Sequence, residues 1–182
     1  SDVSVNAALT GLGANTTYHF RLVGTNSAGT TNGSDQSFTT GTTAKAIIVA
    51  GGGPYVGNNI WAATEMNAGY AFRALLYQGY TKETIYYLSP NTNHDVDGDG
   101  GTDVDAEATI ANFESAVKSW AQDGSDLFIY MIDHGGVGKF RIGPSEQLRA
   151  EDLDAWLDVA QNNGIDKLVV LYDACHSGSF IP

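Results

Sequence analysis

The sequence predicts an α/β protein with a mostly parallel sheet flanked by helices, preceded by a short segment of β structure. Two observations carry this prediction. From residue 45 onward, short apolar runs alternate with stretches in which apolar residues recur at helical spacing. Residues 1–40 are instead rich in Thr, Ser, Asn and Gly and show no helical period. We therefore expect a β segment over residues 1–40, a linker at 41–44 and one α/β domain over 45–182.

The N-terminal segment has the pattern of a small β structure. Residues 18–23 alternate as a strand does, residues 25–30 have turn composition, and residues 36–40 predict a further strand. The run from Leu12 to Tyr18 resembles the tyrosine corner of β-sandwich modules, and with Asn26-Ser-Ala-Gly it resembles the second half of a fibronectin type III domain. Because such a sandwich needs about 100 residues, we expect its earlier strands upstream of residue 1. An unrelated β-hairpin extension is the alternative.

In the α/β part, strands are predicted at the short apolar runs 46–50, 84–88, 127–132 and 167–173. Helices are predicted around residues 68–76, 113–121 and 153–160, where apolar residues repeat at intervals of three and four. Gly79 and Asn163-Gly164 are stop signals for the first and third helices. Strands that alternate with helices of this length predict a parallel sheet with helices on its faces.

Two chemically informative motifs follow two of these strands. His134-Gly135-Gly136 comes after residues 127–132, and Cys175, the only cysteine in the sequence, comes after residues 167–173. Open α/β sheets usually carry their chemistry at the carboxyl ends of the strands. Peptide cleavage by a thiol needs a nucleophile, a proton donor for the leaving amine and donors for the developing oxyanion. We therefore predict Cys175 as nucleophile and His134 as general acid/base, with the amides of Gly135 or Gly136 and of Cys175 as the oxyanion hole.

The two motifs resemble those of caspase-like cysteine peptidases. Asp126-Leu-Phe-Ile-Tyr-Met-Ile-Asp-His134-Gly-Gly is similar to the histidine region of legumain-type peptidases. Asp173-Ala-Cys-His-Ser-Gly-Ser is similar to the nucleophile region of the same superfamily, in a Cys-His-Ser-Gly form closer to metacaspases. The resemblance implies a caspase-like fold and a cysteine endopeptidase that acts on proteins or peptides. It also implies that Asp173 lines the pocket for the side chain before the scissile bond.

The specificity implied by this resemblance departs from that of legumains. Legumains carry an arginine shortly after the first strand that helps to recognise asparagine, whereas residues 51–67 contain neither Arg nor Lys. An acid at Asp173 without a basic neighbour suits an Arg or Lys side chain in the substrate, so cleavage after these residues is predicted. The alternatives are an Asn-specific legumain-like peptidase, a thiol hydrolase of small amides, and a catalytically silent adhesion or scaffold protein. We also expect a C-terminal subunit or segment beyond this chain to complete the pocket.

A dense acidic run occupies residues 95–105 and matches the first half of an EF-hand loop, although Ala106 stands where that loop has its last acid. Hard oxygen donors without nitrogen or sulfur favour calcium, in a structural or regulatory role, and no cofactor is predicted for the chemistry. A solvated acidic loop is the alternative. The predicted ligands are Asp95, Asp97, Asp99, Gly101 through its backbone carbonyl, Asp103 and Asp105.

The composition excludes several classes of function. A formal net charge of −12 argues against nucleic-acid binding, because phosphates would be repelled. No apolar run approaches the length of a membrane span, and no signal peptide is visible. Acidity and a calcium loop favour a secreted or cell-surface protein of a bacterium, whose partners are protein or peptide substrates.

Overall fold

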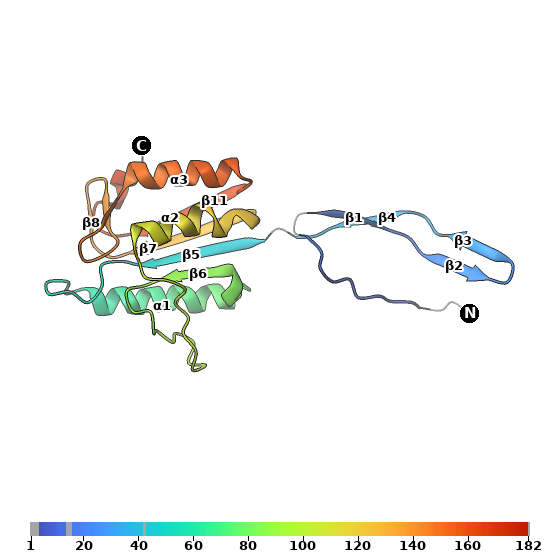
Figure 1. The fold of residues 1–182 in the computed structure, drawn as a ribbon, viewed down its shortest axis with the longest axis horizontal. Coiled ribbons are helices and arrows are strands. Elements are labelled where there is room, and N and C mark those ends of the chain that lie inside the picture. The colour runs from blue at the N-terminus through green and yellow to red at the C-terminus, as the bar shows by residue number, and fades with distance from the viewer. Residues whose placement is uncertain (1–3, 14–15, 42, 182) are drawn as a thin grey trace. The chain divides into compact units, whose positions relative to one another are not determined.

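The computed structural model describes residues 4–13, 16–41 and 43–181, and the chain divides into two units, Ser1–Thr43 and Ala44–Pro182 (Figure 1). Ala14 and Asn15 of the expected tyrosine corner, Thr42 of the expected linker and Pro182 lie outside the described residues. Within the described part of the chain, no helix is long and apolar enough to cross a membrane.

The first unit is a hairpin of short antiparallel strands. Strand β1 (Thr17–Phe20) pairs with β4 (Gln36–Thr39), and β2 (Val23–Asn26) pairs with β3 (Gly29–Asn32) across a turn at Ser27 and Ala28. The strand predicted over residues 18–23 is therefore interrupted at residues 21 and 22. None of the described residues of this unit is buried. The two aromatic rings that stack, those of Tyr18 and Phe38, lie 5.8 Å apart on paired strands.

The second unit is built on a parallel sheet in the order β11-β7-β5-β6. Its strands are β5 (Ala44–Ala50), β6 (Ile85–Leu88), β7 (Asp126–Ile132) and β11 (Lys167–Asp173). Each lies within two residues of its predicted bounds, and the α/β prediction is confirmed. The central strands β5 and β7 are covered on both faces, which is why their sequences are nearly continuous apolar runs.

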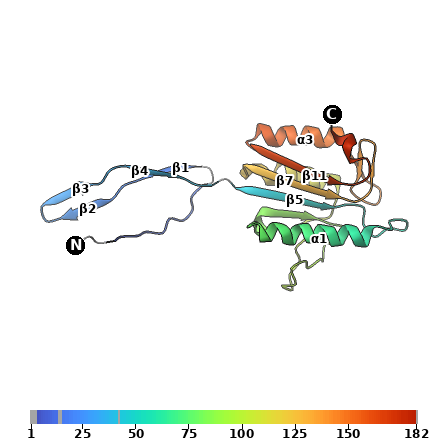
Figure 2. The ribbon, with the colours of Figure 1, turned by 180° about the vertical axis from the view of Figure 1, so that it is seen from behind.

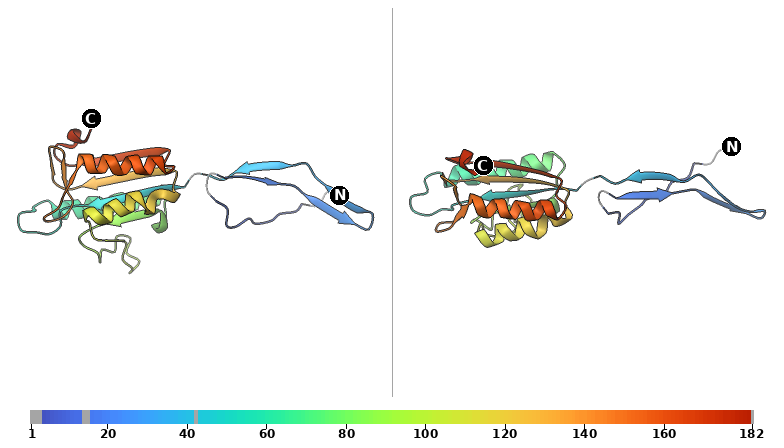
Figure 3. Two further views of the ribbon diagram at one scale, coloured as in Figure 1. Left: turned by 45° about the horizontal axis from the view of Figure 1, so that its top comes forward. Right: turned by 90° about the horizontal axis from the view of Figure 1, so that it is seen from above.

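Helices cover the two faces of this sheet. Helix α1 (Trp61–Tyr77) lies on one face, and α2 (Ile110–Lys118) and α3 (Ala150–Asn162) lie on the other (Figures 1 and 3). Side chains of β5 alternate between the two core clusters: Ile47 packs with α2 and α3, and Ile48 packs with α1. Short 3-10 helices occupy Lys82–Thr84, Trp120–Asp123 and Ser177–Phe180.

Both predicted stop signals end their helices. Gly79 has a φ of 96°, its N–H donates to the Leu76 carbonyl, and the next N–H, of Tyr80, donates to the Leu75 carbonyl, each at 3.1 Å. This is the Schellman arrangement, which favours glycine because of the left-handed backbone. Gly164, with a φ of 111°, ends α3 in the same way.

One small sheet was not predicted from the sequence. After His134, strands β8 (Gly135–Gly136), β9 (Lys139–Arg141) and β10 (Gln147–Arg149) form a small antiparallel sheet in the order β10-β9-β8. Strands of two or three residues are too short to show the alternation by which longer strands are recognised.

Strand β11 lies at the edge of the four-stranded sheet (Figure 2). On one face, Leu168, Val170 and Tyr172 pack against the core cluster of α2 and α3. On the other face, Val169 and Leu171 are 54% and 53% exposed, since α1 packs over β5, β6 and β7. The strand that leads to Cys175 is therefore covered on one face only.

Candidate active site

The parallel pairing of β7 with β11 brings the two predicted catalytic residues to one edge of the sheet. Ile132, at the end of β7, lies opposite Asp173, at the end of β11. His134 and Cys175 each follow two residues later, and both line a hollow of about 520 Å³. Cys175 is exposed and has a free thiol, so a substrate can reach its sulfur.

The loop that begins at His134 and the turn at Cys175 are in direct contact. A Cβ atom built on Gly135 would lie 2.1 Å from the carbonyl oxygen of Cys175 and 2.7 Å from the hydroxyl of Tyr172. Contacts this short cannot be accommodated beside a backbone oxygen. Glycine is therefore required at position 135 for the histidine loop to approach the cysteine turn.

Two hydroxyl groups brace this contact. Ser179 Oγ donates to the carbonyl of His176 at 2.6 Å and accepts the N–H of Gly138 at 2.8 Å. The Tyr172 hydroxyl donates to the carbonyl of Lys139 at 3.1 Å. Burial, together with a charge at Cys175, raises the pKa of Tyr172 to about 12, so its hydroxyl remains protonated. These bonds join the cysteine turn to the small sheet after the histidine, and neither bond could be predicted from the sequence.

The backbone turns sharply after the cysteine. His176 has φ 58° and ψ 23°, and among the described residues it is the one non-glycine with a positive φ. A left-handed residue with a side chain costs roughly 1–2 kcal/mol, so the neighbouring contacts must hold it there. The carbonyl of His176 is held by Ser179, as described above. Asp173-Ala-Cys therefore ends in a turn that leaves the thiol accessible.

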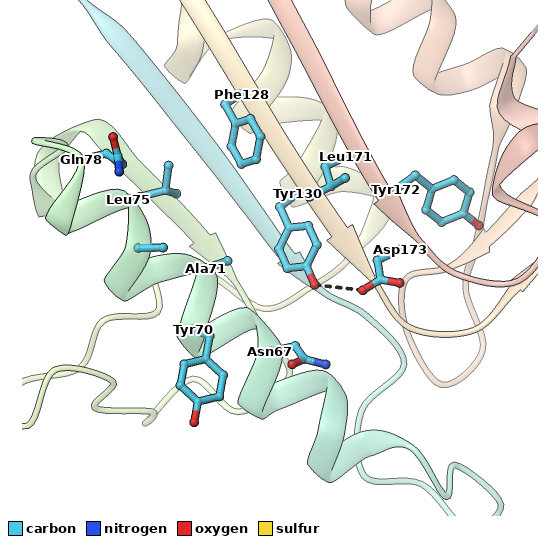
Figure 4. A pocket seen from close by; sticks show the side chains of 11 residues that line it. Asn67, Tyr70, Ala71, Leu75, Gln78, Phe128, Tyr130, Leu171, Tyr172 and Asp173 are labelled. Atoms are coloured by element: carbon cyan, nitrogen blue, oxygen red, sulfur yellow. Dashed lines mark hydrogen bonds between the residues drawn. The ribbon is translucent and has the colours of Figure 1, made fainter.

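Asp173 stands between two hollows. It lines the hollow that contains Cys175 and also an apolar pocket of about 580 Å³ between α1 and strands β7 and β11 (Figure 4). The Tyr130 hydroxyl donates to Asp173 Oδ2 at 3.2 Å. Burial, and then the charge of Asp173, raises the pKa of Tyr130 to about 12, which keeps this hydroxyl a donor. Tyr130 was not predicted to have a role, because only the strand register shows that Tyr130 and Asp173 are neighbours.

Asp133, directly before the histidine, was also not predicted to have a role. Its side chain is almost fully buried, and its Oδ2 accepts from Thr64 Oγ at 3.1 Å and from Asn58 Nδ2 at 3.2 Å. Its Oδ1 has no hydrogen-bond partner among the described residues. A Cβ on Gly52 would lie 2.3 Å from that oxygen, so the glycine lets the loop after β5 close over the carboxylate. Asp133 thus fixes this loop and α1 to the end of β7.

The acidic loop gathers three of the predicted metal ligands. Carboxylate oxygens of Asp95, Asp97 and Asp99 lie within 4.8 Å of one another. The Asp95 carboxylate also accepts the N–H groups of Gly98 at 2.7 Å and Gly100 at 2.9 Å, which fixes the tight turn. Three convergent carboxylates are the hard oxygen donors that calcium prefers.

The other predicted ligands lie outside this group of three. Asp103 is buried, and its Oδ2 accepts the N–H of Val96 at 2.7 Å. The Asp105 carboxylate accepts the N–H of Tyr87 at 2.7 Å. The amide of Gly101 donates to Asp99 at 2.8 Å.

Lys82, which was not predicted to have a role, places its ammonium group among these carboxylates. Its Nζ lies 2.7 Å from Asp99, 2.9 Å from Asp97 and 2.7 Å from Asp103. Hydrogen bonds to these acids, that to Asp103 first, raise the pKa of Lys82, and the bond from Lys82 lowers the pKa of Asp99. The Lys82 ammonium therefore neutralises part of the negative charge of the acidic loop.

Comparison with known families gives one match. The model of the Peptidase C13 family, the legumain family of the caspase-like clan, matches residues 103–182, which is less than half of the chain. The matched part runs from α2 through β7, His134 and α3 to β11 and Cys175. In this part the chain is similar to cysteine peptidases, whose substrates are proteins, and its parallel sheet flanked by helices is consistent with a caspase-like fold. No curated protein matches the chain.

Proposed function

We propose that the protein is a cysteine endopeptidase in which Cys175 is the nucleophile and His134 the general acid/base. The observation that carries the proposal is that an exposed, unpaired thiol shares one hollow with His134, while Gly135 abuts the Cys175 carbonyl. The thiolate attacks the carbonyl carbon of the scissile bond, and His134 gives a proton to the amine as the C–N bond breaks. Water then hydrolyses the thioester and regenerates the thiol.

The pairing of β8 with β9 favours one oxyanion donor over another. The N–H of Arg141 donates to the carbonyl of His134 at 3.0 Å, which makes these two opposite residues a hydrogen-bonded pair. In an antiparallel ladder such pairs alternate with pairs that exchange no bond. Gly135, opposite Phe140, is then the unbonded position, and its N–H points away from β9. The N–H groups of Gly135 and Cys175 are therefore favoured as oxyanion donors over that of Gly136, whose N–H faces Lys139.

The charges in the hollow support a basic residue before the scissile bond. Asp173 and the buried Asp133 both line it, and no described lysine or arginine does. A guanidinium or ammonium group of the substrate would supply the missing positive charge, and arginine can bond a carboxylate with two N–H groups. Tyr130 holds Asp173 at the edge of the hollow through the hydrogen bond described above. We therefore propose cleavage after Arg or Lys rather than after Asn.

The test is a set of fluorogenic peptides that differ only in the residue before the cut, with Arg, Lys, Asn and Asp compared at equal concentration. We expect turnover after Arg and Lys, and we expect Cys175→Ala to abolish both turnover and thiol alkylation while the melting temperature stays close to that of the wild type. Turnover by Cys175→Ala above about a hundredth of the wild-type rate would refute the nucleophile. A clear preference for Asn or Asp would refute the specificity and leave the peptidase assignment intact.

We further propose that Asp95, Asp97 and Asp99 hold a calcium ion. The ion would neutralise the mutual repulsion of these carboxylates and stiffen the loop, and it would have to displace the ammonium of Lys82 from two of them. Binding to the folded state should raise the melting temperature as calcium is added, and magnesium should do so less. Identical melting curves in calcium and in a chelator would refute the site.

A secreted or cell-surface setting and a fibronectin-like N-terminal segment are also proposed. The Gly13 N–H donates to the Tyr18 hydroxyl at 2.8 Å, the type of bond that a tyrosine corner makes. Phe20, Leu22 and Val23 are at least half exposed, which suits side chains that a partner sheet would cover.

A further inference from the structure

A second hollow, of about 210 Å³, adjoins the candidate active site at His134. It is lined by His134, Gly135, Gly136, Lys139, Arg141 and Gln147. His134 lines both hollows, whereas Cys175 and Asp173 line the catalytic hollow and not this one. The two hollows thus share His134 and are otherwise lined by different residues.

The cations of the second hollow lack the partners that the other lysines have. The chain carries nine basic and 21 acidic residues, so carboxylates are abundant. Within the unit from residue 44 onward, every other lysine and Arg149 pair with a carboxylate, in the ion pairs of Lys45, Lys82, Lys118, Arg149 and Lys167. Arg73 also has no ion pair within the part of the chain that the structure describes, but it does not line this hollow, and its guanidinium donates to the Val96 carbonyl and lies over the ring of Tyr70. Among the described residues, Lys139 and Arg141 have no carboxylate within ion-pair distance. In so acidic a protein, two unpaired cations in one hollow indicate a binding site for an anion.

Strand geometry points these side chains the same way. Lys139 and Arg141 are two apart on β9 and therefore lie on one face of the small sheet. Gln147 lies opposite Arg141 on β10, on the same face, and Lys139 lies opposite Gly136 on β8. The main-chain bond from Arg141 to His134 holds this face beside the candidate general acid.

The Arg141 guanidinium is held in place, but not all of its N–H donors are used. One of its terminal nitrogens donates to the Pro144 carbonyl at 2.8 Å, and the group lies over the ring of Tyr55 at 5.5 Å. A guanidinium has five N–H donors, so others remain for a ligand. An ordered arginine loses less side-chain entropy on binding than a free one, which favours recognition of a planar carboxylate.

We propose that this hollow is a subsite for a carboxylate that the substrate carries on the leaving-group side of the scissile bond. The inference rests on the proposed peptidase function, because His134 protonates the leaving amine and the departing segment must therefore pass beside it. Asp173 would then recognise a basic residue before the cut, and Lys139 with Arg141 would recognise an acid after it. The carboxylate can come from an Asp or Glu side chain or from the free C-terminus of a short substrate.

The kinetic test uses quenched fluorescent peptides with Arg before the cut and Glu, Gln or Lys in the two positions after it, each with a free or an amidated C-terminus. For an amidated peptide, we expect kcat/KM to be about fivefold higher with Glu than with Gln, the upper range for a solvent-accessible ion pair. Lys should be cleaved more slowly than Gln, and all differences should shrink in high salt. An advantage confined to short peptides with a free C-terminus would assign the site to the terminal carboxylate. Equal rates across the series would overturn the subsite.

The chain offers a matched control for the variants. Lys139→Gln and the double variant with Arg141→Gln should remove the preference for Glu, and Lys139→Glu should transfer it to Lys. Arg149→Gln removes the same charge from the same small sheet, but Arg149 pairs with Glu151 and does not line the hollow. It should leave the preference unchanged. If Arg149→Gln erased the preference as fully as Lys139→Gln, the general electrostatic potential of the small sheet, and not a binding site, would be responsible for the preference.

A binding measurement separates this inference from the proposed function. The Cys175→Ala protein is titrated with the same peptides, and fluorescence anisotropy reports their dissociation constants. Tighter binding of Glu than of Gln peptides by a protein whose wild type cleaves none of them would refute cleavage after Arg and support the subsite. Cleavage without a preference for either carboxylate would refute the subsite and leave the peptidase proposal standing.

Discussion

The contact between the histidine loop and the cysteine turn can be broken by a single methyl group. Gly135→Ala places a Cβ atom 2.1 Å from the Cys175 carbonyl oxygen and 3.0 Å from the Cβ of Ala174. Neither neighbour is the far end of a flexible side chain, so the strain cannot be relieved by a rotamer change. The backbone of the loop or of the turn must move instead.

The size of this movement follows from the distances. Ordinary van der Waals contact begins at 3.4 Å, so the Cβ and the carbonyl oxygen must separate by at least about 1.3 Å, the difference from 2.1 Å. A misplacement of about 1 Å between catalytic groups can lower a rate about 100-fold. Forced overpacking of this kind typically costs about 1–3 kcal/mol of stability, which leaves an ordinary domain folded at room temperature. We therefore expect kcat/KM to fall about 100-fold in a protein that is still folded.

Gly178→Ala is the matched control, because a Cβ on Gly178 meets no atom within 4 Å and Gly178 lines neither the catalytic hollow nor the second one. Wild type and both variants would be compared for turnover of an Arg peptide, for the rate of Cys175 alkylation and for melting temperature. Gly178→Ala should retain near wild-type values in all three. If Gly135→Ala cleaved within about threefold of Gly178→Ala, the apposition of Gly135 and Cys175 would not be what aligns the site, since a displacement of this size should cost far more.

Three further outcomes are expected. Lys82→Met should tighten calcium binding, measured by titration calorimetry, because no ammonium competes for Asp99. Without calcium, Lys82→Met should lower the stability to urea more at pH 7 than below pH about 4. The bond from Lys82 lowers the pKa of Asp99 in the folded state, so it stabilises the fold at a pH above the pKa of Asp99 in the unfolded chain. This contribution is lost as the pH falls and the Asp99 carboxylate is protonated. Asp173→Asn should reduce kcat/KM for Arg peptides about tenfold, whereas Asp166→Asn, in the turn before β11, should not. Ser179→Ala should slow turnover more than it slows thiol alkylation, since it loosens the turn without touching the sulfur.

Strands that are continuous apolar runs could be predicted from the sequence, and contacts between residues far apart in the sequence could not. The apolar runs of β5 and β7 are recognisable because both faces are buried. The start of α1 at Trp61 was not recognisable, because its first buried side chain, that of Thr64, is polar and bonds to Asp133, 69 residues away. The histidine and cysteine were found because each lies two residues after an apolar run, although β11 is covered on one face only.

Several contacts around the candidate sites depend on how the strands pair, and the sequence of one strand alone does not reveal its pairing register. Tyr130 and Asp173 are 43 residues apart and meet only because β7 and β11 pair with Leu171 opposite Tyr130. Lys82 follows α1 and gives no local sign that its ammonium lies among carboxylates of the loop after β6. The hollow beside His134 depends on strands of two and three residues, which are recognisable only once they are paired.

The strand that carries the nucleophile has pairing on one side and packing on one face. Among the described residues β11 bonds to β7 alone, and Val169 and Leu171 on its α1 side are half exposed. Pairing with β7 therefore fixes the position of Cys175 along the strand direction relative to His134, but it constrains the position of Cys175 across the sheet only weakly. That second position is set by the bonds of Tyr172 and Ser179 with the small sheet after the histidine and by the contact at Gly135. Because those same strands carry Lys139 and Arg141, the proposed subsite for the substrate acid and the bonds that position Cys175 depend on one small sheet.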